Sequence, residues 1–201
     1  MTAFAARRTV AIDLLYLDLE VCTRCRATDA NLETALTAVQ GVLEAAGAEV
    51  RVTKTLVGSE QKARALGVLS SPTIRVNGGD IALEFRESRC ESEACECTAG
   101  GGDPIDCRVW VYQGKEYTEA PVPMVVDAIL SQVYGAAIAD PPKPAPVDVP
   151  ENLLRLFRSK ERNKESACCD ARQQESCCEP SEKVSCCGAA KEADARACGC
   201  Q

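Results

Sequence analysis

The chain has 201 residues, a formal net charge of −7, fourteen cysteines and no histidine. It is acidic and has no basic stripe, so we expect no nucleic-acid partner. No segment approaches the roughly 18 consecutive apolar residues of a membrane-spanning helix, and no signal peptide is visible, so we expect a cytoplasmic protein with no membrane span.

The first predicted elements alternate between strand and helix. The apolar, β-prone run 10–17 predicts a central strand covered on both faces. Apolar residues at helical spacing over 31–46 predict a helix that stops at Gly47. The alternating run 48–57 predicts a second strand, and residues 59–67 predict a short helix capped by Ser59.

The second half of the predicted domain has more extended chain. Residues 70–83 predict a strand, an Asn-Gly-Gly turn and further extended chain. A Cys-rich insert covers 86–107, a strand with a glycine turn follows, and 122–135 predict the last helix. The order β-α-β-α-β-β-α predicts one α/β domain over residues 1–135.

The abundance of cysteine and the absence of histidine define the available chemistry. In a cytoplasmic chain, many cysteines indicate metal binding or redox chemistry. Without imidazole, ligands must be thiolate, carboxylate or backbone groups, and thiolates favour soft or borderline ions. We therefore expect As(III), Hg(II), Cu(I) or Zn(II), and no organic cofactor.

Cys22 and Cys25 lie where the first strand meets the first helix, in the sequence Cys-Thr-Arg-Cys. A helix N-terminus and nearby arginines favour thiolate over thiol. We predict that Cys22 is an exposed nucleophile or first ligand and that Cys25 is the resolving thiol or second ligand. A structural disulfide or an inert pair is the alternative.

This dicysteine and the later Ser71-Pro72-Thr73 resemble the thioredoxin fold. In that superfamily the proline is cis and lies beside the dicysteine, which implies that Pro72 shapes the site; an ordinary loop proline is the alternative. The runs LLYLDLEVCTRC, SSPTIRVNGGDIALE, CRVWVYQGKEYTEAP and AILSQVYG resemble the prokaryotic DUF2703 family over about residues 8–135. That family often occurs among heavy-metal or arsenic resistance functions, so the resemblance implies a thioredoxin-like fold and soft-metal or thiol chemistry.

The insert carries four cysteines that could surround one tetrahedral ion, with zinc as the leading option. They are Cys90, Cys95, Cys97 and Cys107. Their spacing matches no standard zinc ribbon, so two disulfides remain an alternative. These thiols could also pass an ion or a disulfide to Cys22 and Cys25, if the insert folds back over the helix start.

Past residue 135 the composition changes three times. Residues 136–150 form a Pro-rich linker, and 151–165 predict a short amphipathic helix. We expect this helix to dock on the main domain rather than to anchor the chain to a membrane. The tail, 166–201, has no aromatic residue and cannot build a core, so we expect it to be largely disordered.

The tail contains eight cysteines, and its Cys-Cys pairs recur every nine residues. They are Cys168, Cys169, Cys177, Cys178, Cys186, Cys187, Cys198 and Cys200. In composition this resembles metallothionein-like segments, in which ligand bonds replace a missing core. We predict a metal-binding tail; a disordered tail with incidental cysteines is the alternative.

Three functions fit these features. The leading one is binding, transfer or detoxification of soft metal or metalloid ions, with the tail capturing ions and the domain transferring or reducing them. The second is a dithiol–disulfide oxidoreductase. The third is alkylmercury lyase-type cleavage of a carbon–metal bond, in which Asp18 or Asp29 would assist two thiols. A thiol reductant or a metal-handling protein would be the partner.

Overall fold

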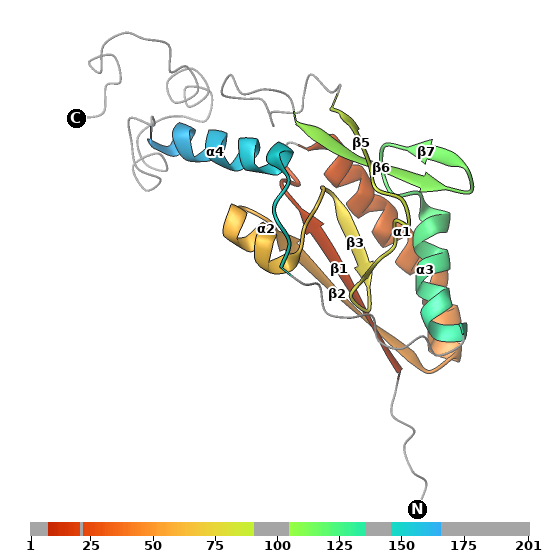
Figure 1. The fold of residues 1–201 in the computed structure, drawn as a ribbon. Helices are drawn as coiled ribbons and strands as arrows, with labels where there is room; N and C mark the ends of the chain where they lie inside the picture. The colour runs from red at the N-terminus through yellow and green to blue at the C-terminus, as the bar shows by residue number, and fades with distance from the viewer. Residues whose placement is uncertain (1–7, 21, 91–104, 136–145, 166–201) are drawn as a thin grey trace, which may run out of the picture.

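The computed structural model describes residues 8–20, 22–90, 105–135 and 146–165. Within these ranges, four helices and seven strands follow one another along the chain (Figure 1). Their bounds are β1 Arg8–Tyr16, α1 Thr23–Ala45, β2 Ala48–Leu56, α2 Glu60–Leu66, β3 Thr73–Val76, β4 Gly79–Asp80, β5 Arg86–Arg89, β6 Asp106–Tyr112, β7 Lys115–Tyr117, α3 Val122–Tyr134 and α4 Glu151–Glu165.

A four-stranded mixed sheet forms the centre, in the order β2-β1-β3-β4. Strands β1 and β2 are parallel, joined through α1, and Arg8 pairs with Ala48. Strand β3 is antiparallel to β1, with Leu14 opposite Ile74, and β4 is antiparallel to β3. The predicted α/β class is confirmed.

The predicted helices are present, and one starts earlier than its apolar stripe indicated. Helix α2 has Ser59 as its N-cap, with the Ser59 hydroxyl accepting from the Lys62 backbone at 3.3 Å, and it ends at Gly67 with φ +61°. Helix α1 begins at Thr23, so the dicysteine opens it as predicted, eight residues before the apolar stripe that starts at residue 31. Its first turns bury Cys25 and Thr28, which a search for large apolar residues overlooks.

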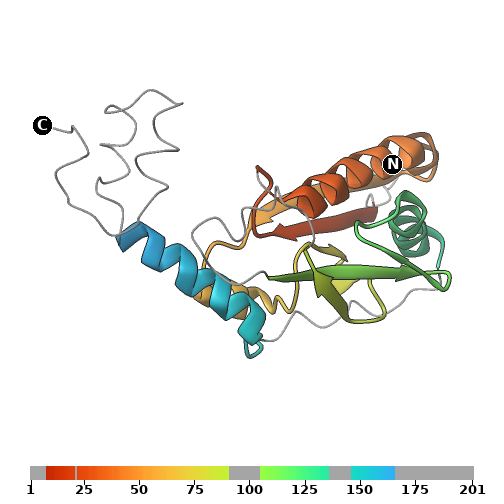
Figure 2. The same ribbon diagram turned by 90° about the horizontal axis from the view of Figure 1, so that it is seen from above.

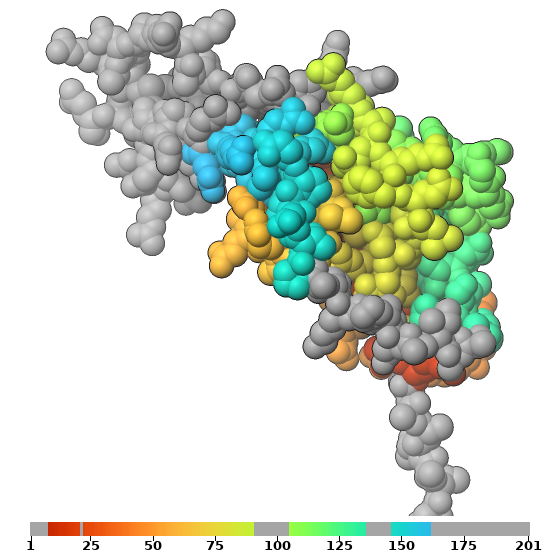
Figure 3. Space-filling view, in the orientation of Figure 1, coloured from red at the N-terminus to blue at the C-terminus, as the bar shows by residue number. Residues whose placement is uncertain are grey.

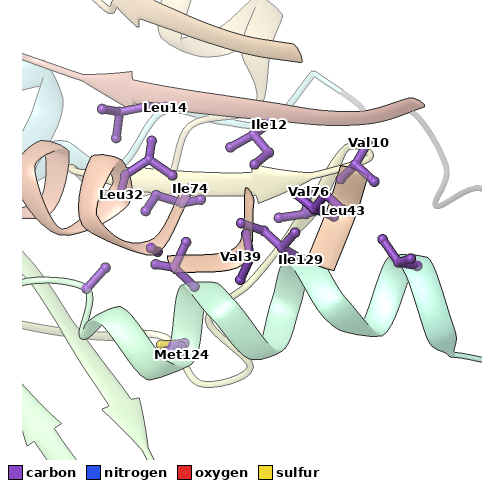
Figure 4. Packing of buried hydrophobic residues seen from close by; sticks show 14 of the residues in the cluster. Val10, Ile12, Leu14, Leu32, Val39, Leu43, Ile74, Val76, Met124 and Ile129 are labelled. Atoms are coloured by element: carbon purple, nitrogen blue, oxygen red, sulfur yellow. The ribbon is translucent and has the colours of Figure 1, made fainter. Parts of the chain in front are cut away.

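Helices α1 and α3 cover one face of the central sheet (Figures 1 and 2). The apolar side chains of β1 and β3 that point to this face meet those of both helices in one buried cluster (Figure 4). Its labelled members are Val10, Ile12, Leu14, Leu32, Val39, Leu43, Ile74, Val76, Met124 and Ile129. This core holds α1 in place and thereby the residues at its start.

A second buried cluster gathers residues from α2, α4 and the end of β1. Leu15 and Leu17 contribute from β1 and the residue that follows it, and Leu153, Leu156 and Phe157 contribute from α4. Figure 3 shows the surface of α4 lying against that of α2. Helix α4 is therefore packed on the domain by its apolar face.

A second sheet, in the order β5-β6-β7, includes both ends of the Cys-rich insert. No secondary structure was predicted for residues 86–107, but the insert begins in β5 and ends in β6, and these strands pair antiparallel with Ser88 opposite Cys107. Strands β6 and β7 are joined by a tight turn in which Gln113 and Gly114 have positive φ, at 50° and 76°. None of the helices in the described ranges is long and apolar enough to cross a membrane.

Candidate dithiol site

Cys22 and Cys25 lie one helical turn apart at the start of α1. Cys22 is the N-cap residue, in an extended backbone conformation, and its sulfur accepts a hydrogen bond from the Cys25 backbone N–H at 3.3 Å. A sulfur in this position receives one of the N–H groups that a helix start leaves without an intrahelical partner. Both residues are thiols, not disulfide partners. The geometry suits a reactive dithiol.

The turn before β3 links the dithiol to the rest of the domain. The Ser71 hydroxyl lies 3.6 Å from the Cys25 sulfur and accepts a hydrogen bond from the Leu17 backbone at 3.2 Å. The Ser71 carbonyl accepts from the Arg108 backbone N–H in β6 at 3.0 Å. The Ser71–Pro72 peptide bond is cis, as the resemblance implied for Pro72. The turn therefore contacts the end of β1, the start of α1 and β6.

The surroundings of Cys25 disfavour loss of its proton. The pKa of Cys25 is raised well above its ordinary value, chiefly because Cys25 shares a hydrogen bond with the Cys22 sulfur. Burial and the negative charge on Cys22 act in the same direction, while the Ser71 hydroxyl and the Leu17 backbone lower the pKa only in part. Cys25 therefore holds its proton at neutral pH.

The expected exposure of Cys22 is wrong. Its side chain is 2% exposed and that of Cys25 is 1% exposed. Strand β5, for which the sequence holds no local signal, packs at the same helix start. The Arg24 guanidinium donates to the Ser88 hydroxyl at 3.0 Å and to the Arg89 carbonyl at 3.1 Å. The arginine between the two cysteines thus serves as a tether to β5.

The acidic residues named for carbon–metal cleavage have partners of their own. Asp29 forms an ion pair with Lys54 at 2.6 Å, which Glu33 shares at 2.7 Å. Asp18 accepts a hydrogen bond from the Glu20 backbone at 2.8 Å and lies 3.8 Å from the Lys160 ammonium. These contacts supply no support for either carboxylate as a proton donor at the dithiol.

The remaining predicted ligands are described only in part. Cys107 is buried in β6, and Cys90, directly after β5, is half-buried and donates its backbone N–H to Ile105 at 3.3 Å. Cys95, Cys97 and the eight tail cysteines lie outside the described residues, so their metal binding stays a prediction. Among the residues that are described, no group of three or more Cys, Asp or Glu side chains is arranged to hold a metal ion.

The sequence model of DUF2703, a domain of unknown function, matches residues 10–129. The chain belongs to this family. The DUF2703 match takes in the dithiol, the Ser71 turn and both strands that flank the insert, and it ends within α3, ahead of α4. Neither the curated proteins nor the solved structures contain a significant match to this DUF2703 chain.

Two residues of the DUF2703 site were not identified as site residues from the sequence. Ser71 was named only as a neighbour of Pro72 in the Ser71-Pro72-Thr73 sequence, although its hydroxyl contacts the Cys25 sulfur. Arg24 was interpreted only as a source of positive charge, although it binds β5. Their positions, next to Pro72 and inside the Cys-Thr-Arg-Cys sequence, were the available signals.

Proposed function

We propose that this DUF2703 protein binds and transfers soft metal or metalloid ions through thiolates. The observation that carries the proposal is the buried pair formed by Cys22 and Cys25, with one sulfur accepting a backbone N–H and the other held by Ser71. Two thiolates one turn apart offer the two-sulfur ligand set that Hg(II) and Cu(I) accept. As(III) and Zn(II) require further ligands.

A thioredoxin-like fold is part of the proposal. The strand order β2-β1-β3-β4, with α1 joining parallel β1 and β2, supports it. The position of the dithiol at the start of α1, beside the turn that precedes β3, supports it as well. In this arrangement Pro72 borders the site and Cys22 is the first ligand.

In this proposal the tail, residues 166–201, binds and stores the ions, and the domain transfers them through its dithiol. Eight of the fourteen cysteines belong to the tail, so most of the binding capacity would reside there. The ion-pair distance of 3.8 Å between Lys160 in α4 and Asp18, four residues before Cys22, supports this division. It places the helix that leads into the tail beside the segment that leads into the dithiol.

The test compares the full chain, the chain ending at Glu165 and Cys22→Ser in each, all loaded anaerobically with Hg(II) or arsenite. We expect removal of the tail to eliminate most of the bound ion measured by elemental analysis. Cys22→Ser should leave most of the capacity of the full chain, because the tail thiols remain. In the short chain it should remove the ion held by the dithiol and leave only what the insert thiols bind. Equal capacity losses from Cys22→Ser and from tail removal would contradict the proposal.

A dithiol–disulfide oxidoreductase is the second candidate, favoured by the proton that Cys25 retains beside the Cys22 sulfur. Such a pair can attack a substrate disulfide through Cys22 and resolve it through Cys25. If the chain ending at Glu165 keeps full disulfide reductase activity, and cells expressing it tolerate arsenite and mercury as well as cells with the full chain, this candidate replaces the first.

The affinity of the dithiol for an ion should rise with pH. Because the pKa of Cys25 is raised, the folded protein holds this proton at neutral pH, and an ion that binds both sulfurs must displace it. Each proton released makes affinity increase about tenfold per pH unit below the pKa. We expect this slope for Cu(I), which accepts two sulfur ligands, competed against a chelator between about pH 6 and 8, using the chain ending at Glu165.

The matched control for the pH experiment is Cys25→Ser in the same short chain. This variant keeps Cys22 but lacks the proton to be displaced, so its remaining affinity should depend less on pH. Calorimetry in buffers of different ionisation enthalpy counts the protons directly. Affinity that is constant across this pH range in the parent chain would show that Cys25 is not a ligand.

A further inference from the structure

The two strands that flank the insert are held against the start of α1. On β5, the Arg24 guanidinium binds both the Ser88 hydroxyl and the Arg89 carbonyl. On β6, the Arg108 backbone N–H binds the Ser71 carbonyl at 3.0 Å. One tether comes from between the two cysteines and the other from the turn that contacts Cys25. The small sheet is therefore fixed to the dithiol site at two points.

The register of the two strands shows which way Cys107 points. Ser88 and Cys107 are directly opposite each other in the antiparallel β5–β6 pair. Directly opposed residues extend to the same face of a sheet. Because the Ser88 hydroxyl reaches Arg24, this face is the one toward the start of α1. Cys107 thus extends toward the helix start that carries Cys22 and Cys25.

The residue after Cys107 fixes its position along the site. Arg108 bonds through its backbone to Ser71, whose hydroxyl lies 3.6 Å from the Cys25 sulfur. The Arg108 side chain extends to the opposite face, where it forms an ion pair with Asp80 at 2.8 Å. Cys107 is 3% exposed, so its thiol lies inside the protein beside this turn and not on the surface.

We propose that Cys107 is the third reactive thiol of the dithiol site and the partner that resolves disulfides formed at Cys22. The inference rests on the proposed function only in taking Cys22 as the thiol that reacts first. It replaces the expectation that Cys107 serves solely in a separate metal site of the insert. It also assigns to an insert thiol the exchange of a disulfide with Cys22. That exchange requires the strands of the insert to lie over the helix start.

The proposed exchange is balanced when a small-molecule disulfide supplies the oxidising equivalents. The Cys22 thiolate attacks one sulfur of oxidised glutathione, forms a Cys22–glutathione disulfide and releases one glutathione thiolate. The Cys107 thiolate then attacks the Cys22 sulfur, forms a Cys22–Cys107 disulfide and releases the second glutathione. Thiolates are the attacking species in such exchange, and Cys107 is placed for the second step because it extends toward the helix start that carries the Cys22 sulfur.

The test treats the reduced full chain with oxidised glutathione, blocks the remaining thiols by alkylation and maps the disulfides by mass spectrometry. Trypsin cuts after Arg24 and Arg108, and a protease specific for aspartate cuts before Asp18 and Asp106. The three cysteines then fall in separate peptides. We expect the peptide with Cys22 to be linked to the peptide with Cys107.

Cys90→Ser is the matched control, because Cys90 follows β5 two residues after Ser88 and leaves the Cys22–Cys107 pair intact. This link should persist in Cys90→Ser and in Cys25→Ser. In Cys107→Ser it should be lost, and the Cys22–glutathione adduct should accumulate.

The outcomes distinguish a wrong role for Cys107 from a wrong reactivity for Cys22. If Cys22 reacts with glutathione but pairs only with Cys25 or with the tail, the role of Cys107 is wrong and the reactive dithiol stands. If Cys22 does not react at all, both the role of Cys107 and the reactivity assigned to Cys22 are wrong.

Discussion

The Leu32→Ala variant is expected to lower the free energy of unfolding by about 2–5 kcal/mol. Leu32 is fully buried between α1 and the β1–β3 face of the sheet (Figure 4). Truncation removes the transfer free energy of its methyl groups and leaves a cavity that the surrounding side chains fill only in part. Because Cys22 caps α1 and Cys25 lies in its first turn, the same loss should loosen the helix that positions both thiols.

Urea unfolding followed by tryptophan fluorescence measures this loss. The chain has a single tryptophan, Trp110, whose side chain is 0% exposed in the same buried cluster as Leu32. Val42→Ala is the matched control on the same helix, since Val42 is 43% exposed and should change stability by no more than about 0.5 kcal/mol. Equal shifts of the two midpoints would show that this face of α1 is not packed as described.

The elements of the central sheet were predictable because their signals are local. The apolar run of β1 and the cap and glycine of α2 each lie within a dozen residues, and both elements formed close to the expected bounds. Strand β5 gave no such signal: Arg-Glu-Ser-Arg has no apolar residue, and the strand exists because it pairs with β6 across the insert. Pairing between distant segments is not encoded in the composition of either one.

The two cysteines of the candidate site were predicted from the sequence, but their burial was not. The spacing of Cys22 and Cys25 after a strand was enough to locate the dithiol at a helix start. Its burial depends on tertiary contacts, because the Arg24–Ser88 hydrogen bond joins residues that are 64 positions apart. The contact between Ser71 and Cys25 spans 46 positions, so no local pattern could distinguish Ser71 from an ordinary turn residue.

The chain ending at Pro150 is expected to be several kcal/mol less stable than the chain ending at Glu165. The shorter chain lacks α4, whose Leu153, Leu156 and Phe157 are 0%, 2% and 4% exposed. Burial of such a side chain contributes about 1.5–3 kcal/mol, an upper estimate because unfolded chains already bury some apolar surface. Chemical denaturation of both chains, followed through Trp110, measures the difference.

Loss of α4 should also affect the dithiol site, because Asn152 holds the start of β6. Its side chain accepts from the Asp106 backbone N–H at 2.9 Å and donates to the Asp106 carbonyl at 2.7 Å. Asp106 directly precedes Cys107, so without α4 the strand that carries this thiol loses two hydrogen bonds. We expect faster alkylation of Cys107 in the chain ending at Pro150, and of Cys22 as well if the two thiols share one site.

Point variants separate the packing of α4 from the effect of shortening the chain. Leu153→Ala should cost about 2–5 kcal/mol, while Arg155→Ala, on the exposed side of the same helix, should have little effect. If both variants match the full chain in stability and thiol reactivity, α4 does not contribute to the core. If Leu153→Ala alone reproduces the loss, the folded unit extends to Glu165. Removal of the tail beyond that residue is then a test of ion storage that leaves the dithiol site intact.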